Sequence, residues 1–190
     1  MKRSARLLVS AALTLALTHR RAVTAALAAS LFLLAAARDT LGAVFVVRHA
    51  EKQTDSNDKD VPLSEAGRAR AKRLKEMLRD ARIVAIYSTD TVRTLSTAEP
   101  LAKESKLEPA IYSTAGPGGD VVLKPLADRI RREHPSEYVL VVGHSNTIAP
   151  LVRALGCREE VEVGGQEYDG LWIVGPAPNG AAPMLLRLRQ

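Results

Sequence analysis

One stretch constrains the fold of this chain more than any other. The apolar run Val44-Phe45-Val46-Val47 leads directly into Arg48-His49-Ala50-Glu51-Lys52. A continuous apolar run of this kind is typical of a strand whose two faces are both covered, as in a parallel sheet. In open α/β sheets the ligand site lies beyond the carboxyl ends of the strands, so Arg48 and His49 would stand at that edge. By itself the stretch also fits a strand that ends in a solvated polar turn.

Strand-type and helix-type segments alternate along the rest of the chain. We expect strands at 43–47, 83–87, 110–112, 138–142, 171–174 and 184–188, and helices at about 65–79, 91–106, 121–134 and 145–155. Ser64 is a plausible N-cap for the first helix. The alternation predicts a three-layer α/β/α sandwich with a mostly parallel central sheet.

Three of the buried strands run straight into polar or histidine-bearing turns. These exits are Arg48-His49, Ser88-Thr89-Asp90 and Gly143-His144-Ser145. At one sheet edge they would gather a shared set of side chains: Arg48, His49, Arg93, His144, Ser145 and Asn146. Two arginines can hold an oxyanion by bidentate hydrogen bonds, and a helix N-terminus after Gly143 adds backbone N–H groups. A neutral imidazole can attack phosphorus, so the set favours phosphoryl transfer.

Metal binding is the competing use of histidine. Metal sites gather His, Cys or carboxylate ligands, whereas arginines dominate here and would repel a cation. Cys157 is the only cysteine of the chain, so it can form no intrachain disulfide, and we expect it to be a packing residue. We therefore expect no metal and no other cofactor.

The motifs in this order resemble the histidine phosphatase superfamily, which has the phosphoglycerate-mutase-like fold. They are Arg48-His49-Ala50-Glu51, Pro62-Leu63-Ser64 with Gly67, Ser88 through Arg93-Thr94 with Thr97-Ala98, and Gly143-His144-Ser145-Asn146. The resemblance covers about residues 43–176. Each motif is weak alone, and their common order and spacing make the set specific.

The resemblance implies a role for each matched residue. His49 would be the nucleophile that becomes phosphohistidine, Arg48 and Arg93 would bind the phosphoryl group, and His144 would be the second histidine of the pocket. Ser145 and Asn146 would either bind phosphate or simply cap the following helix.

The general acid is less well defined. A leaving alkoxide needs a proton, which a carboxylic acid usually supplies in this family. Asp120 follows the loop Ala115-Gly116-Pro117-Gly118-Gly119 at a position resembling that of the family's acid, although glutamate is more typical there. Asp120 fits equally well as the N-cap of a helix that starts at Val121. Without an acid, good leaving groups such as phosphohistidine would be favoured.

The resemblance implies a metal-independent phosphatase that acts on phosphomonoesters or on protein phosphohistidine. A phosphomutase of the same fold is a second reading, although the short loop after His49 fits hydrolysis better. A phosphate-binding module without turnover is a third, and such a module would be expected to lack His49 or His144. We expect phosphorylated small molecules, glycans or proteins as substrates, and no nucleic acid.

The first 40 residues carry most of the excess positive charge. The chain has 190 residues and a net charge of +6, and Lys2, Arg3, Arg6, Arg20 and Arg21 account for most of it. Apolar runs at 7–17 and 22–37 are short for a bilayer span, and Ala35-Ala36-Ala37 suits signal-peptide cleavage. We expect residues 1–40 to be a signal peptide or an N-terminal membrane anchor and residues 41–190 to be the phosphatase domain. Export to the periplasm or beyond would follow, with membrane contact only through an uncleaved leader. A cytosolic protein with an extra helix is the alternative.

Overall fold

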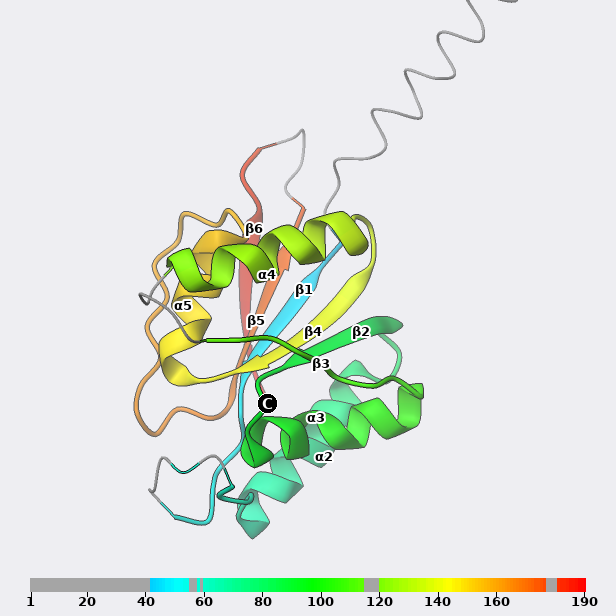
Figure 1. The fold of residues 1–190 in the computed structure, drawn as a ribbon, viewed down its shortest axis with the longest axis vertical. Helices are drawn as coiled ribbons and strands as arrows, with labels where there is room; N and C mark the ends of the chain where they lie inside the picture. Colours follow the sequence, from blue (N-terminus) through cyan, green and yellow to red (C-terminus); the bar gives the residue numbers. More distant parts are fainter. Residues whose placement is uncertain (1–41, 55–57, 59, 115–119, 177–180) are drawn as a thin grey trace, which may run out of the picture. The chain divides into compact units, whose positions relative to one another are not determined.

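The fold is seen in a computed structural model that describes residues 42–54, 58, 60–114, 120–176 and 181–190, with the backbone alone at 120–122 (Figure 1). The expected leader at 1–40 lies outside the described residues. Within those residues, no helix is both long and apolar enough to span a bilayer.

The helices and strands follow the predicted alternation. The strands are β1 (Val44–Arg48), β2 (Ile83–Ser88), β3 (Ala110–Ile111), β4 (Tyr138–Gly143), β5 (Gly170–Gly175) and β6 (Met184–Arg189). The helices are α2 (Glu65–Leu78), α3 (Val92–Ser105), α4 (Asp120–Glu133) and α5 (Ser145–Ala154). Ser64 is the N-cap of α2, as predicted, and its side chain accepts a hydrogen bond from the Gly67 N–H.

Two helix starts differ in detail from the sequence expectation. Asp120 is the first residue of α4, so the helix starts one residue before the expected Val121. The N-cap of α5 is His144, and Ser145 is the first helical residue. Neither Ser145 nor Asn146 is therefore the N-cap of that helix.

The strands of the described region form one mixed sheet in the order β3-β2-β4-β1-β5-β6. The pairs β1–β4, β2–β4 and β2–β3 are parallel, and β5 and β6 complete the sheet with antiparallel pairs. Arg48 is opposite Gly143, and Ser88 is opposite Val142. The carboxyl ends of β1, β2 and β4 therefore lie level at one edge, as the three strand exits predicted.

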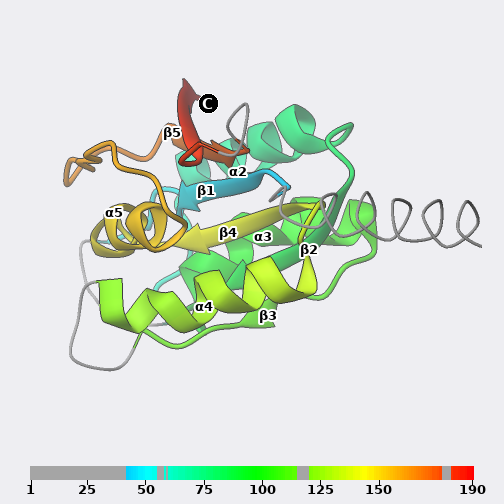
Figure 2. The same ribbon diagram turned by 90° about the horizontal axis from the view of Figure 1, so that it is seen from above.

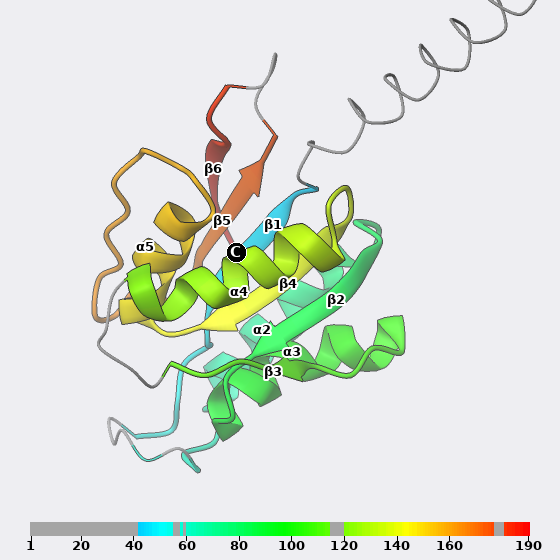
Figure 3. The ribbon, with the colours of Figure 1, turned by 45° about the horizontal axis from the view of Figure 1, so that its top comes forward.

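Helices cover both faces of the sheet and give it two apolar cores. On one face, α4 and α5 supply residues such as Ile130 and Leu151, which pack with Val46 and Val141 of the sheet. On the other face, α2 and α3 supply residues such as Leu74 and Leu101, which pack with Val47 and Val142. Successive strand residues point to opposite faces, so apolar runs such as 44–47 are buried on both sides. The views in Figures 2 and 3 show these layers, and the three-layer prediction is confirmed.

Candidate active site

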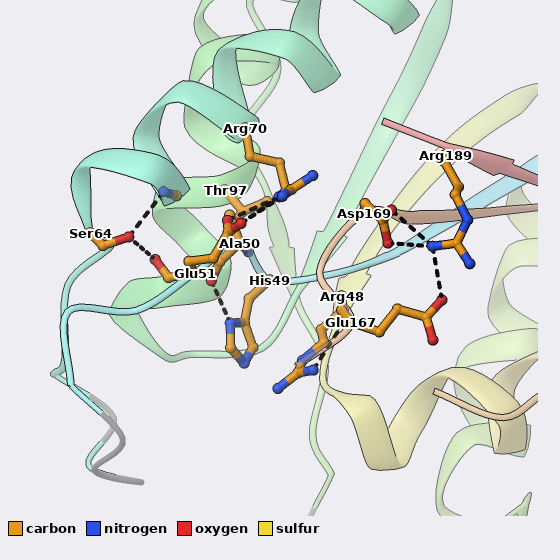
Figure 4. Close-up of polar contacts among 11 residues, drawn as sticks. Arg48, His49, Ala50, Glu51, Ser64, Arg70, Thr97, Glu167, Asp169 and Arg189 are labelled. Atoms are coloured by element: carbon orange, nitrogen blue, oxygen red, sulfur yellow. Dashed lines mark hydrogen bonds and ion pairs between the residues drawn. The ribbon is translucent and has the colours of Figure 1, made fainter. Parts of the chain in front are cut away.

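Residues 49–51 continue β1 beyond the sheet edge and are held by three elements; we call them the nucleophile loop after the role that the resemblance implies for His49. The His49 N–H donates to the Gly143 carbonyl of β4 (2.9 Å). The Ala50 N–H donates to the Thr97 hydroxyl of α3 (2.9 Å), and the Glu51 carbonyl accepts from the Ser64 N–H at the start of α2 (2.9 Å). Figure 4 shows Ser64 and Thr97 beside this loop. Each backbone position of the loop is thus fixed from a different part of the fold.

The ring of His49 is held as one tautomer. Its Nδ1 lies 2.8 Å from the Ala50 carbonyl oxygen, which can only accept, so Nδ1 carries the proton. The pKa of His49 is lowered to about 3, chiefly by burial, against the Ala50 hydrogen bond, which raises it; the nearby His144, Arg48 and Arg93 act in the same direction as burial. At neutral pH the imidazole is therefore uncharged, with its free lone pair on Nε2.

His144 lies beside His49 although the two are far apart in sequence. The centroids of the two rings are 5.3 Å apart, in an edge-on arrangement. Nε2 of His144 is hydrogen bonded to the Thr89 hydroxyl at 3.0 Å, and Thr89 is buried just after β2. Burial lowers the pKa of His144 to about 4, with Arg93 and Arg48 contributing in the same direction. Both histidines are thus neutral at physiological pH.

Arg48 is held by the segment between α5 and β5. Its Nη1 donates to the carbonyl oxygens of Gly164 (3.0 Å), Gly165 (2.9 Å) and Glu167 (3.0 Å). Its guanidinium carbon lies 4.0 Å from the centroid of the Tyr168 ring, in cation–π geometry. The centroid of the Tyr168 ring is itself 5.8 Å from that of His49, so this segment lies beside both Arg48 and His49.

Arg93 approaches from the first turn of α3. Its side chain is buried, and Nη1 donates to the carbonyl of Asp58 at 2.8 Å. Burial lowers the pKa of both Arg48 and Arg93, and each guanidinium keeps its charge at neutral pH. Among the described residues, the buried Nε atoms of both arginines have no hydrogen-bond partner. Leaving such a donor unsatisfied costs about 1–3 kcal/mol, which an oxyanion ligand would offset.

Glu51 is paired away from the two histidines. Its carboxylate accepts from Nε and Nη2 of Arg70 on α2, at 2.6–3.0 Å (Figure 4). Burial alone would raise the pKa of Glu51, but the Arg70 hydrogen bonds keep it below its usual value. The carboxylate of Glu51 therefore belongs to an ion pair with Arg70.

Of the remaining predicted site residues, the structure describes Ser145 and Asn146 but not the side chain of Asp120. Ser145 and Asn146 form the start of α5, next to His144, and their phosphate contacts stay a prediction. The side chain of Asp120 lies outside what is described, so its role as general acid also stays a prediction. Cys157 is buried in the core beside α5, as expected for a packing residue. No group of three His, Cys, Asp or Glu suited to a metal ion occurs in the described part of the chain.

Sequence reasoning missed three contacts of this site. Thr89 and Thr97 lie inside the motifs quoted above, each four residues from Arg93, and a hydroxyl at that spacing from a candidate phosphate-binding arginine was the available signal. Tyr168 had no such signal, because it follows no strand exit and belongs to no motif. Its position depends on how the segment after α5 returns to the sheet.

The sequence was compared with models of known protein families and with curated proteins. Residues 44–114 match the family model of the histidine phosphatase superfamily (branch 1). Comparison with curated proteins gave no match.

Solved structures share the fold at low sequence identity. A mycobacterial glucosyl-3-phosphoglycerate phosphatase aligns with a TM-score of 0.60 and 17% identity, over 78% of this chain and 97% of its own. The protein histidine phosphatase SixA, solved with tungstate, gives a TM-score of 0.59 and 18% identity, over 77% and 96%. A phosphoserine phosphatase from Entamoeba histolytica gives 0.56 and 14%, over 79% and 98%.

The family match includes Arg48, His49 and Arg93, and the likeness in fold extends over most of the chain. The resemblance to the histidine phosphatase superfamily is therefore confirmed, in sequence over residues 44–114 and in fold over about four-fifths of the protein.

Proposed function

We propose that the protein is a phosphatase that works through a phosphohistidine on His49. The observation that carries this proposal is the hydrogen bond from His49 Nδ1 to the Ala50 carbonyl at 2.8 Å. It leaves the lone pair on Nε2, beside His144 and two buried arginines. A neutral, oriented imidazole among fixed positive charges is suited to attack a phosphoryl group.

The reaction would proceed in two displacements at phosphorus. Nε2 of His49 attacks, the P–N bond forms, and the bond from phosphorus to the leaving oxygen breaks. A proton from Asp120 would neutralise the leaving alkoxide. Water then attacks the phosphohistidine and gives one proton to the Asp120 carboxylate, the P–N bond breaks, and inorganic phosphate leaves. Arg48, Arg93 and His144 would stabilise the charge on the equatorial oxygens through both steps.

The solved relatives support a phosphorylated substrate. The proteins of similar fold have been solved with vanadate, tungstate or phosphate, oxyanions that resemble a phosphoryl group. Their names describe phosphatases for a sugar phosphoglycerate, for phosphohistidine and for phosphoserine. We propose the same breadth of candidates here: phosphomonoesters or a protein phosphohistidine.

The direct test is hydrolysis of an aryl phosphate by the chain with and without its nucleophile. We expect turnover that is unchanged by a metal chelator, and a fall of at least about 10³-fold in kcat for His49→Ala, because no other group would form the covalent intermediate. Circular dichroism controls for folding of the variant. Wild-type turnover in His49→Ala would refute the role of this residue.

The general acid is tested through the leaving group. Asp120→Asn should slow an alkyl phosphate, whose alkoxide needs a proton, at least ten times more than a nitrophenyl phosphate, whose leaving group does not, as expected from the usual 10²–10⁴-fold contribution of acid catalysis. Steady-state kcat for both substrates gives the ratio. An equal effect on the two substrates would remove Asp120 from the acid role.

A further inference from the structure

We propose that Thr97 is a positioning residue that orients the His49 imidazole through Ala50. This inference rests on the proposed function of His49, and it assigns Thr97 no contact with substrate.

The Thr97 side chain joins the nucleophile loop to the helix that carries Arg93. Thr97 is 3% exposed, and its hydroxyl accepts from the Ala50 N–H at 2.9 Å. The same hydroxyl donates to the Arg93 carbonyl at 2.7 Å. An N–H can only donate and a carbonyl can only accept, so the direction of both bonds is fixed.

Ala50 transmits this anchoring to the ring of His49. Its N–H is held by Thr97, and its carbonyl receives the Nδ1 proton of His49 at 2.8 Å (Figure 4). Ala50 is fully buried, so water does not readily replace either bond. The contacts that run from Arg93 through Thr97 and Ala50 therefore end on Nδ1 of His49. Because Nδ1 carries the proton, the lone pair is left on Nε2.

The other two anchors of the loop bind the residues on either side of Ala50 and make no hydrogen bond to Ala50 itself. Gly143 binds the N–H of His49, and Ser64 binds the carbonyl of Glu51. Both would remain in a variant that lacks the Thr97 hydroxyl, so the loop would stay attached to β4 and α2. The expected defect is a local rotation of Ala50 and a poorly oriented His49 ring.

Three substitutions in the full chain separate positioning from stability. Thr97→Val keeps the shape of the side chain and removes the hydroxyl, and Thr97→Ser restores the hydroxyl without the methyl. Ile130→Val, in the opposite core, is the control for a small loss of thermal stability. Thr97→Ala is the second hydroxyl-free variant if Thr97→Val does not fold.

Kinetics with an aryl phosphate give the first measurement. We expect kcat to fall about 10- to 100-fold in the hydroxyl-free variant, as for a reacting group displaced by about 1 Å, with KM changed less than about threefold. Thr97→Ser and Ile130→Val should stay within about threefold of wild type. Equal kcat in wild type and a folded hydroxyl-free variant would overturn the proposal.

Imidazole ¹⁵N NMR gives a second measurement that needs no turnover. His49 should show protonated Nδ1 and bare Nε2 in wild type, in Thr97→Ser and in Ile130→Val, and a mixture of tautomers without the hydroxyl. An unchanged tautomer in the hydroxyl-free variant would overturn the positioning role. A wild-type chain with no phosphatase activity would instead overturn the proposed function, and the NMR result would still decide whether Thr97 orients the ring.

Discussion

At the residue scale, burial sets the charge state of the two histidines. An exposed histidine has a pKa near 6.5, whereas burial lowers that of His49 to about 3 and that of His144 to about 4. Arg48 and Arg93 supply fixed positive charge beside them. The site thus combines permanent cations with neutral imidazoles, a combination that suits the proposed attack on a phosphoryl group.

This burial links the stability of the folded chain to pH. Between about pH 6.5 and pH 3–4 the unfolded histidines bind protons and the folded ones do not, so the free energy of unfolding must fall as the pH falls. Each histidine accounts for about 2 kcal/mol of this loss between pH 7 and pH 5. Urea unfolding at a series of pH values measures it. His49→Gln should show a shallower slope than wild type, and an identical slope would contradict a depressed pKa at His49.

At the scale of the elements, the start of α2 acts as a clamp on the nucleophile loop. The Ser64 hydroxyl accepts from the Gly67 N–H at 3.1 Å and donates to the Glu51 carbonyl at 3.2 Å. A Cβ on Gly67 would lie 2.1 Å from that carbonyl oxygen, so the helix can approach the loop this closely only with glycine there. The Ser64 hydroxyl therefore caps α2 and at the same time holds the Glu51 carbonyl of the nucleophile loop.

Gly67→Ala tests this clamp. Alanine improves helix propensity by up to about 1 kcal/mol, but the backbone clash should outweigh that gain and destabilise the fold by about 1–3 kcal/mol net. We also expect a lower kcat, because the clash must displace the Glu51 carbonyl, and Glu51 belongs to the same loop as His49. Thermal unfolding and aryl phosphate kinetics measure the two effects.

Gly175→Ala is the matched control for the clamp. Gly175 ends β5, and a Cβ there meets nothing within 4 Å. The activity of the Gly175→Ala variant should equal that of wild type. A Gly67→Ala variant as stable and as active as the Gly175→Ala control would contradict the close approach of α2.

At the scale of the whole molecule, the layered fold was predictable because the signals for it are local. Runs such as 44–47 and 139–142 are apolar at every position, which indicates strands buried on both faces, and the intervening helices show one apolar side each. Arg48, His49 and His144 lie at or just after the ends of these runs, and Arg93 lies in the first turn of the helix that follows the strand at 83–88, so all four could be named from the sequence as candidates.

Other features depend on contacts between distant segments and had no local signal. The sequence did not reveal that β4 lies between β1 and β2, or that β5 and β6 pair antiparallel beside β1. Tyr168 reaches Arg48 only because the segment after α5 returns to that side of the sheet. The pairing of Glu51 with Arg70 likewise requires α2 to lie against the nucleophile loop.

In the proposed function, strand ends that lie far apart in the sequence assemble one phosphoryl-transfer site with His49 as nucleophile. The most direct measurement is rapid acid-free quenching of the enzyme during turnover of an aryl phosphate, followed by peptide mapping by mass spectrometry. We expect up to one phosphoryl group per chain, attached to His49 and absent from His49→Ala. A phosphoryl group on any other residue, or single-turnover hydrolysis with no phosphoenzyme formed, would contradict it.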